Sequence, residues 1–194
     1  MLTDLPNLLT LSRIAAIPIL VLLIAINAPM ADLLACALFA LAGITDWLDG
    51  QLARSRKQLS DLGRMLDPIA DKLLVGATLM LLVGFHRLPA FGIYPAIVIM
   101  LREILVSGLR EYLAGIRVGL PVTKLAKWKT ASQMLALGVL LLGDPGAHRL
   151  GLGWIPTADF GGLLLWAAAG LTLVTGWDYL TAGLRHVIEP GSLG

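Results

Sequence analysis

Apolar residues in this chain form six long runs that short polar stretches separate. The runs cover roughly residues 8–28, 32–53, 62–85, 91–115, 124–143 and 160–183, and those from the second to the fifth carry ionisable residues toward one end. A helix needs about 20 predominantly apolar residues to cross the hydrocarbon core of a bilayer. The pattern therefore predicts an all-α, polytopic membrane protein with six transmembrane helices. The length suits a single domain, residues 1–194, without a separate soluble module.

Composition supports the membrane class. The mean hydropathy is +0.82 and 14% of the residues are charged, whereas soluble domains carry roughly 25% charge. A soluble helical bundle is disfavoured because its helices would need a polar face. Cys36 is the only cysteine, so no intrachain disulfide can form and redox chemistry is not expected. The first residues lack the basic region and cleavage site of a signal peptide, so we expect the first run to remain as an anchor.

The basic residues predict an orientation. If both termini are cytoplasmic, only Arg87 and Arg149 of the fifteen lysines and arginines fall on the outer side. The division is still eleven to two when Arg102 and Lys72, which lie well inside their runs, are set aside. Cytoplasmic loops of membrane proteins carry an excess of Lys and Arg. We therefore expect a multi-pass protein of the inner (cytoplasmic) membrane with both termini in the cytoplasm, and no nucleic-acid partner.

Acidic residues gather where the second and third runs meet, and their spacing places them on two helical stripes. The first stripe is Asp46, Asp49 and Ala53, and the second is Gly63, Asp67 and Asp71. The polar segment "SRKQLSD" between them offers Ser60 or Asp61 as a cap for the next helix. Because the connection is short, we expect the two helices to be direct neighbours with their stripes facing each other.

Four carboxylates so close together would repel one another, and at membrane depth each is costly. Protonation or bound cations would relieve the repulsion, and carboxylates without histidine or cysteine favour Mg²⁺ or Mn²⁺. Two such ions are a recurring device for in-line phosphoryl displacement. Arg54 could hold a phosphate one turn further on, and small residues leave room for a substrate near the backbone. The alternatives are a solvated acidic turn, or aspartates paired with Arg54, Arg64 and Lys72.

The eight residues Asp46, Asp49, Gly50, Ala53, Arg54, Gly63, Asp67 and Asp71 occupy a 26-residue pattern. This pattern resembles the complete signature of the CDP-alcohol phosphotransferase family, in which CMP is displaced from a CDP-activated lipid by an acceptor hydroxyl. The resemblance implies two divalent ions (Mg²⁺ or Mn²⁺) held by Asp46, Asp49, Asp67 and Asp71, with Asp71 also the general base. It places Asn7, Thr10, Asp49, Gly50, Ala53, Arg54 and Gly63 along CDP-diacylglycerol. It also implies six spans, cytoplasmic termini and a homodimer.

Three further segments resemble the family members that use glycerol 3-phosphate as the acceptor and make phosphatidylglycerol phosphate. They are "PNLLTLSRI" (residues 6–14), "REILVSGLREYLA" (residues 102–114) and "KLAKWKTASQM" (residues 124–134). Their cations suit a second anion in the site, because an acceptor phosphate needs charge-assisted donors. We expect the glycerol 3-phosphate subsite to contain Arg110, Lys127, Lys129 and Arg102. Arg102 and Glu103 could instead brace the bundle, and Lys124 is expected to be an ordinary membrane anchor.

Other functions stay open at this point. Within the family, an inositol phosphate or phosphatidylglycerol acceptor would want similar charges. A cation transporter or channel would also place carboxylates in the membrane. A conduction path should continue across the bilayer, but the third run contains no acid beyond Asp71. Residues beyond about 140 look like generic apolar helix and carry no resemblance.

Overall fold

The computed structural model describes residues 5–56, 61–116, 118 and 124–188. Side-chain positions are described for these residues except 5–7, 47–56, 61–65, 67, 124 and 184–188. The described part contains six α-helices and no strand. The helices are α1 (Leu5–Ile26), α2 (Pro29–Arg56), α3 (Asp61–Gly84), α4 (Ile93–Gly115), α5 (Lys124–Arg149) and α6 (Thr157–Ile188). The all-α prediction is therefore confirmed for this part of the chain.

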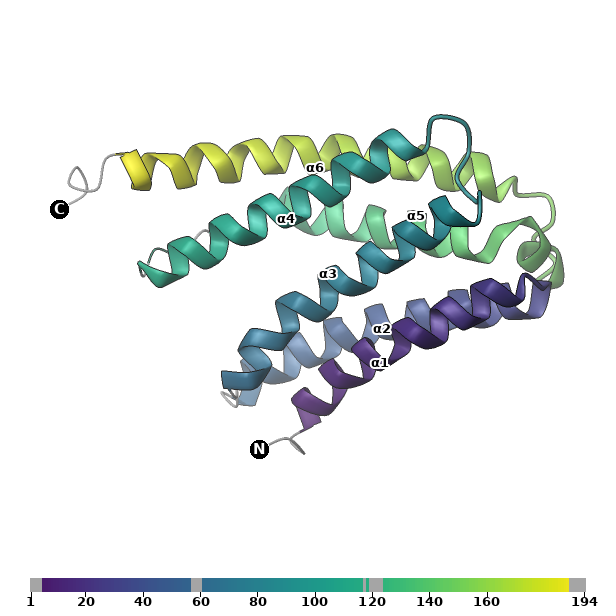
Figure 1. Cartoon of the computed structure of the whole chain (residues 1–194), viewed down its shortest axis with the longest axis horizontal. Coiled ribbons are helices and arrows are strands. Elements are labelled where there is room, and N and C mark those ends of the chain that lie inside the picture. The colour runs from purple at the N-terminus through teal and green to yellow at the C-terminus, as the bar shows by residue number, and fades with distance from the viewer. Residues whose placement is uncertain (1–4, 57–60, 117, 119–123, 189–194) are drawn as a thin grey trace.

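The helices run back and forth along one direction (Figure 1). Helices α1, α3 and α5 begin at the end of the bundle where α2, α4 and α6 finish. We call this end the site end, because Asp46 near the end of α2 and Asp71 near the beginning of α3 belong to it. The connections α1–α2, α3–α4 and α5–α6 lie at the opposite end. Both described ends of the chain therefore lie on the same side of the bundle.

Three of the helices are long and apolar enough to cross a membrane on length and composition alone. Their spans are Leu8–Ile26 in α1, Pro29–Asp46 in α2 and Thr157–Gly183 in α6. Helices α3 and α4 also expose large apolar side chains, such as Met80 at 73% and Leu101 at 64%. Water disfavours such surfaces, whereas lipid accepts them. The membrane class is thus supported, and six spans remain a prediction.

A shared apolar core joins the helices, with fully buried side chains such as Leu20, Phe39, Leu79 and Leu137. Small residues allow close packing where helices meet, as is typical of membrane bundles. At Gly161 of α6 a Cβ atom would lie 2.7 Å from the Leu140 side chain of α5. Of all the described helix pairs, α5 and α6 pack together most extensively.

The packing of α2 and α3 differs from the sequence prediction. In the described part of the chain, α2 packs mainly on α1 and α5, and α3 packs mainly on α1. Helix α1 is therefore the main common neighbour of both acidic helices. A short connection brings the ends of two helices together but leaves the angle between them open, so another helix can pack against both.

Helix α5 is interrupted at the predicted limit of the fifth apolar run, before its last residues. Gly143 has a φ of 59° and a ψ of 168°, which breaks the helix into two pieces. Glycine adopts this left-handed φ without steric cost. Asp144 follows the break and accepts hydrogen bonds from the backbone N–H (2.8 Å) and the hydroxyl (2.6 Å) of Thr157. The carboxylate thus satisfies donors at the beginning of α6.

An ion pair fastens the opposite end of the bundle. Arg87, just beyond α3, lies 2.7 Å from the Asp32 carboxylate at the beginning of α2. The same guanidinium donates to the side-chain oxygen of Asn27 (3.1 Å) and to the backbone carbonyl of Leu141 (3.3 Å). Arg87 therefore ties α3 to the α1–α2 turn and to α5.

Candidate active site

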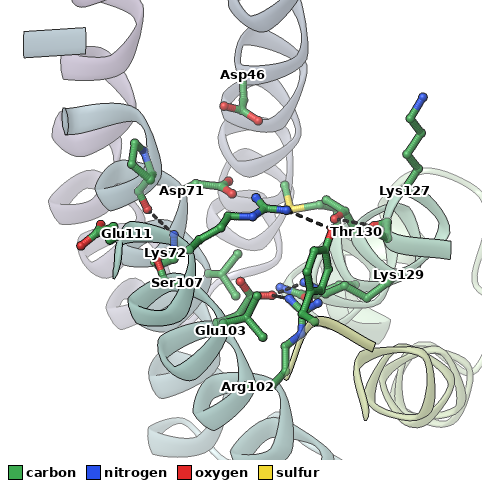
Figure 2. Close-up of a pocket in the computed structure, with 18 of the residues that line it drawn as sticks. Asp46, Asp71, Lys72, Arg102, Glu103, Ser107, Glu111, Lys127, Lys129 and Thr130 are labelled. Carbon is green, nitrogen blue, oxygen red and sulfur yellow. Dashed lines mark hydrogen bonds and ion pairs between the residues drawn. The ribbon is translucent and has the colours of Figure 1, made fainter. Parts of the chain in front are cut away.

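A cavity of about 1440 Å³ lies toward the site end of the bundle, with walls from α2, α3, α4, α5 and α6. Its described carboxylates are Asp46, Asp71, Glu103 and Glu111, and its described cations are Lys72, Arg102, Arg110, Lys127 and Lys129 (Figure 2). Described members of the carboxylate and cation sets, which the sequence predicted separately, therefore share one cavity.

Two of the four predicted metal-binding aspartates line this cavity together. Asp46 comes from α2 and Asp71 from α3. Asp71 is close enough to interact electrostatically with Asp46, Glu103, Arg13 and Lys72. Carboxylate oxygens that face a polar cavity are suitable ligands for a hard divalent cation. The donor set present therefore fits the predicted metal.

The other six residues of the eight-residue signature have no described side chain. Asp49, Gly50, Ala53 and Arg54 belong to α2, and Gly63 and Asp67 belong to α3. Asn7 of α1 is in the same position. Among the described side chains, no three His, Cys, Asp or Glu groups come together as a metal site. Two of the four predicted metal ligands, Asp49 and Asp67, thus lie outside the described side chains.

Asp46 has a partner that the sequence did not predict. The guanidinium of Arg13, buried in α1, forms an ion pair with the Asp46 carboxylate. The sequence had offered Arg54, Arg64 and Lys72 as partners for the aspartates. The side chains of Arg54 and Arg64 lie outside the described residues. The ammonium of Lys72 donates to the Pro68 carbonyl (2.8 Å) and interacts electrostatically with Asp71. The available signal was an arginine inside an apolar run, because such a charge requires a counter-charge within the bundle.

Thr10, the other described nucleotide candidate, is also buried in α1. It lies three residues before Arg13 and therefore on the same helical face. It does not belong to the described lining of the cavity. A contact of Thr10 with CDP-diacylglycerol stays a prediction.

The predicted acceptor cations differ in their surroundings. Lys129 is 5% exposed and pairs with Glu103 of α4. Arg102 lies 3.6 Å from the same carboxylate and donates to the Thr175 hydroxyl (3.1 Å). Glu103 therefore balances part of the positive charge in this wall of the cavity.

Arg110 and Lys127 differ in where they lie in the cavity. Arg110 donates to the phenol oxygen of Tyr179 at 3.0 Å. Lys127 is exposed, and its side chain extends away from Lys129 and Glu103 (Figure 2). Lys124 begins α5, and its side chain lies outside the described residues. The structure thus gathers Arg102, Arg110 and Lys129 and leaves Lys127 at the periphery.

Helix α6 contributes side chains that the sequence analysis missed. Thr175 and Tyr179 contact Arg102 and Arg110, although this last third of the chain looked like generic apolar helix. The available signal was their i, i+4 spacing, which places two polar groups on one face of an apolar helix. Gly176 lies between them, and a Cβ atom there would be 3.1 Å from Cγ of Arg102. This helix therefore shapes the wall that holds the two arginines.

Comparison with known proteins gives one consistent family. A family model described as CDP-alcohol phosphatidyltransferase matches residues 3–174. A CDP-diacylglycerol–glycerol-3-phosphate 3-phosphatidyltransferase of Rickettsia bellii is 46% identical over 183 residues, which cover 94% of this chain and 97% of the relative. Proteins of the same description from Pseudomonas fluorescens and Bacillus subtilis are 41% and 39% identical. These matches cover 97% and 92% of this chain, and 94% of each relative.

Proposed function

Because the chain belongs to the CDP-alcohol phosphatidyltransferase family, we propose that it transfers the phosphatidyl group of CDP-diacylglycerol to sn-glycerol 3-phosphate. The products are phosphatidylglycerol phosphate and CMP. The observation that carries this proposal is the near full-length similarity to relatives that are all described by this reaction. The cavity supports it, because carboxylates suited to a metal face cations suited to a second phosphate. We infer that residues 1–194 form a single domain that carries out this reaction.

The family generally depends on a divalent metal. We propose that Asp46, Asp49, Asp67 and Asp71 hold two Mg²⁺ or Mn²⁺ ions, since the two described members of this set line the cavity. When bound, such ions neutralise charge on the pyrophosphate and orient it for displacement. Arg13 holds the Asp46 carboxylate in place from the buried side of α1.

The chain's own side chains would then divide the remaining tasks. Asn7, Thr10, Gly50, Ala53, Arg54 and Gly63 would border the CDP group, as the resemblance implies. Asp71 would accept the proton from the attacking hydroxyl of glycerol 3-phosphate, since its carboxylate lines the cavity near the α4 cations. Arg102, Arg110, Lys127 and Lys129 would bind the acceptor phosphate. Of these, Lys127 would act at the periphery because its side chain extends away from Arg102 and Lys129.

We propose that all six helices cross the inner membrane and that the cavity faces the cytoplasm. An even number of crossings returns the chain to the side on which it began, which agrees with both described ends lying at the site end. The lysines and arginines of α4 and α5, apart from Arg149, lie toward this end too, as expected for a cytoplasmic surface. A homodimer is part of the same proposal through the family resemblance.

An acceptor screen tests the reaction directly. Purified protein would receive CDP-diacylglycerol and Mg²⁺ with glycerol 3-phosphate, inositol phosphate or phosphatidylglycerol, and both CMP and the lipid product would be measured. We expect glycerol 3-phosphate to give the highest rate and phosphatidylglycerol phosphate as product. A faster reaction with another acceptor would refute the choice of alcohol. Ion flux across vesicles without CMP release would refute the proposal that the protein is an enzyme and would favour a transporter or channel.

Asp67→Asn tests the metal site, because it keeps the size of the side chain and removes one charged ligand. We expect transfer to be almost completely lost while the protein stays folded, since less carboxylate repulsion should not harm the bundle. Asp159→Asn is the matched control, because Asp159 is exposed in the first turn of α6 at the opposite end. Ordinary activity of Asp67→Asn at the usual Mg²⁺ concentration would remove Asp67 from the site.

A further inference from the structure

Tyr179 of α6 contacts two of the cations in the cavity wall. Its ring centroid lies 5.6 Å from the guanidinium carbon of Arg102 and 5.1 Å from that of Arg110. Its hydroxyl oxygen accepts a hydrogen bond from Arg110 at 3.0 Å. The side chain is only 4% exposed, yet it lines the cavity. One aromatic residue thus fixes both arginines of α4 from a different helix.

The chemistry of this contact differs from that around Lys129. The carboxylate of Glu103 largely balances the charge of Lys129. A phenol ring attracts a guanidinium through its π face and leaves the positive charge uncompensated. Arg110 therefore keeps an attraction for an anion while its position is held. A guanidinium has five N–H donors, so one hydrogen bond to Tyr179 leaves others for two-point contact with a phosphate.

Neighbouring positions on α6 support the same arrangement. The Thr175 hydroxyl accepts from Arg102 at 3.1 Å, one turn before Tyr179. Gly176 lets the stem of Arg102 approach the backbone of α6, since a Cβ atom there would be 3.1 Å from Cγ of Arg102. Three positions within five residues of α6 therefore accommodate the arginines of α4.

We propose that Tyr179 is a positioning residue for the acceptor, holding Arg102 and Arg110 so that their remaining N–H groups bind the phosphate of glycerol 3-phosphate. Helix α6 then forms the part of the acceptor subsite that holds the two arginines, and it sets the affinity for the acceptor without touching the nucleotide. This inference rests on the proposed function.

Two substitutions separate positioning from simple packing. Tyr179→Phe keeps the ring and removes the hydroxyl, and we expect it to raise KM for glycerol 3-phosphate about 2- to 12-fold, the value of one net hydrogen bond. Tyr179→Leu also removes the π face and should raise this KM further, about 10- to 100-fold. KM for CDP-diacylglycerol should stay within about twofold if the effect is confined to the acceptor. Tyr94→Phe is the matched control, since Tyr94 is exposed at the beginning of α4 at the opposite end.

The measurements are steady-state CMP release with each substrate varied in turn and thermal unfolding of every variant. A graded rise in the acceptor KM, with partial retention by Tyr179→Phe, supports the inference. Equal changes in both KM values, or a lower melting temperature with unchanged KM values, would overturn it and leave the proposed function intact. If the unmodified protein releases no CMP with glycerol 3-phosphate, the proposed function fails and this inference fails with it.

Discussion

The ion pair between Arg87 and Asp32 allows a quantitative test of how the bundle is held together. The side chains of Arg87 and Asp32 are 12% and 5% exposed, and Nη2 of Arg87 lies 2.7 Å from Oδ1 of Asp32. This oxygen accepts no well-aligned hydrogen bond from the described residues, so the contact is purely an ion pair. Arg87→Met keeps much of the apolar stem and removes the charge. Asp32 would then remain as a buried carboxylate without its counter-charge, which is the costly outcome for such a pair.

The expected magnitude follows from these contacts. Removing one member of a buried ion pair costs about 3–5 kcal/mol, and loss of the two further hydrogen bonds of Arg87 adds about 1 kcal/mol in total. We therefore expect Arg87→Met to lower the free energy of unfolding by about 4–6 kcal/mol. Adding Asp32→Asn should restore about 2–3 kcal/mol, because a buried amide costs much less than a buried charge.

Thermal unfolding in detergent measures both variants. For a chain of this size about 1 kcal/mol corresponds to about 2–4 °C, so the double variant should melt clearly above Arg87→Met. Arg149→Met is the control, since Arg149 is exposed at the same end of the bundle and should change little. Both KM values should stay unchanged, because the pair is remote from the cavity. Equal melting temperatures for Arg87→Met and the double variant would refute the idea that the unpaired carboxylate is the cause.

Two further predictions concern packing and pH. Gly162→Ala would place a Cβ atom 2.4 Å from the rigid ring of Pro89 and should lower the free energy of unfolding by about 1–3 kcal/mol. Gly43→Ala would place a Cβ atom 2.7 Å from the flexible end of Met134 and should lower it by less than about 1 kcal/mol. Equal melting temperatures for the two variants would contradict this difference. Hydrogen bonds from the hydroxyl and backbone N–H of Thr157 lower the pKa of Asp144 in the folded protein. The ionised carboxylate therefore stabilises the fold fully above the pKa of an unfolded aspartate, about 3.9. This stabilisation is lost as the pH falls through the lower pKa of the folded state. The difference in melting temperature between the unmodified protein and Asp144→Asn should therefore be constant near neutral pH and shrink below about pH 4, and a constant difference down to pH 2 would contradict this role.

Much of the architecture follows from the sequence because its signals are local. Apolar runs of membrane-spanning length predict helices close to those observed, and the fifth run ends at Gly143, where the helix breaks. The spacing of Asp46 and Asp71 within their signature predicts carboxylates at one end of the bundle, and both line the cavity there. Helical periodicity depends on neighbours a few residues apart, so it can be read without knowledge of the fold.

The partners of the charged groups were decided only by the tertiary structure. Arg13 pairs with Asp46 33 residues away, and Arg110 contacts Tyr179 69 residues away. Such pairs depend on which helices become neighbours, and the α1 helix, rather than a direct α2–α3 contact, is the main common neighbour of both acidic helices in the described part of the chain. Lipid-facing and core-facing side chains are similarly apolar in a membrane protein, so the hydrophobic pattern does not specify how helices pack. Close fits such as Gly176 against Arg102 make that choice, and they exist only once the helices are in contact.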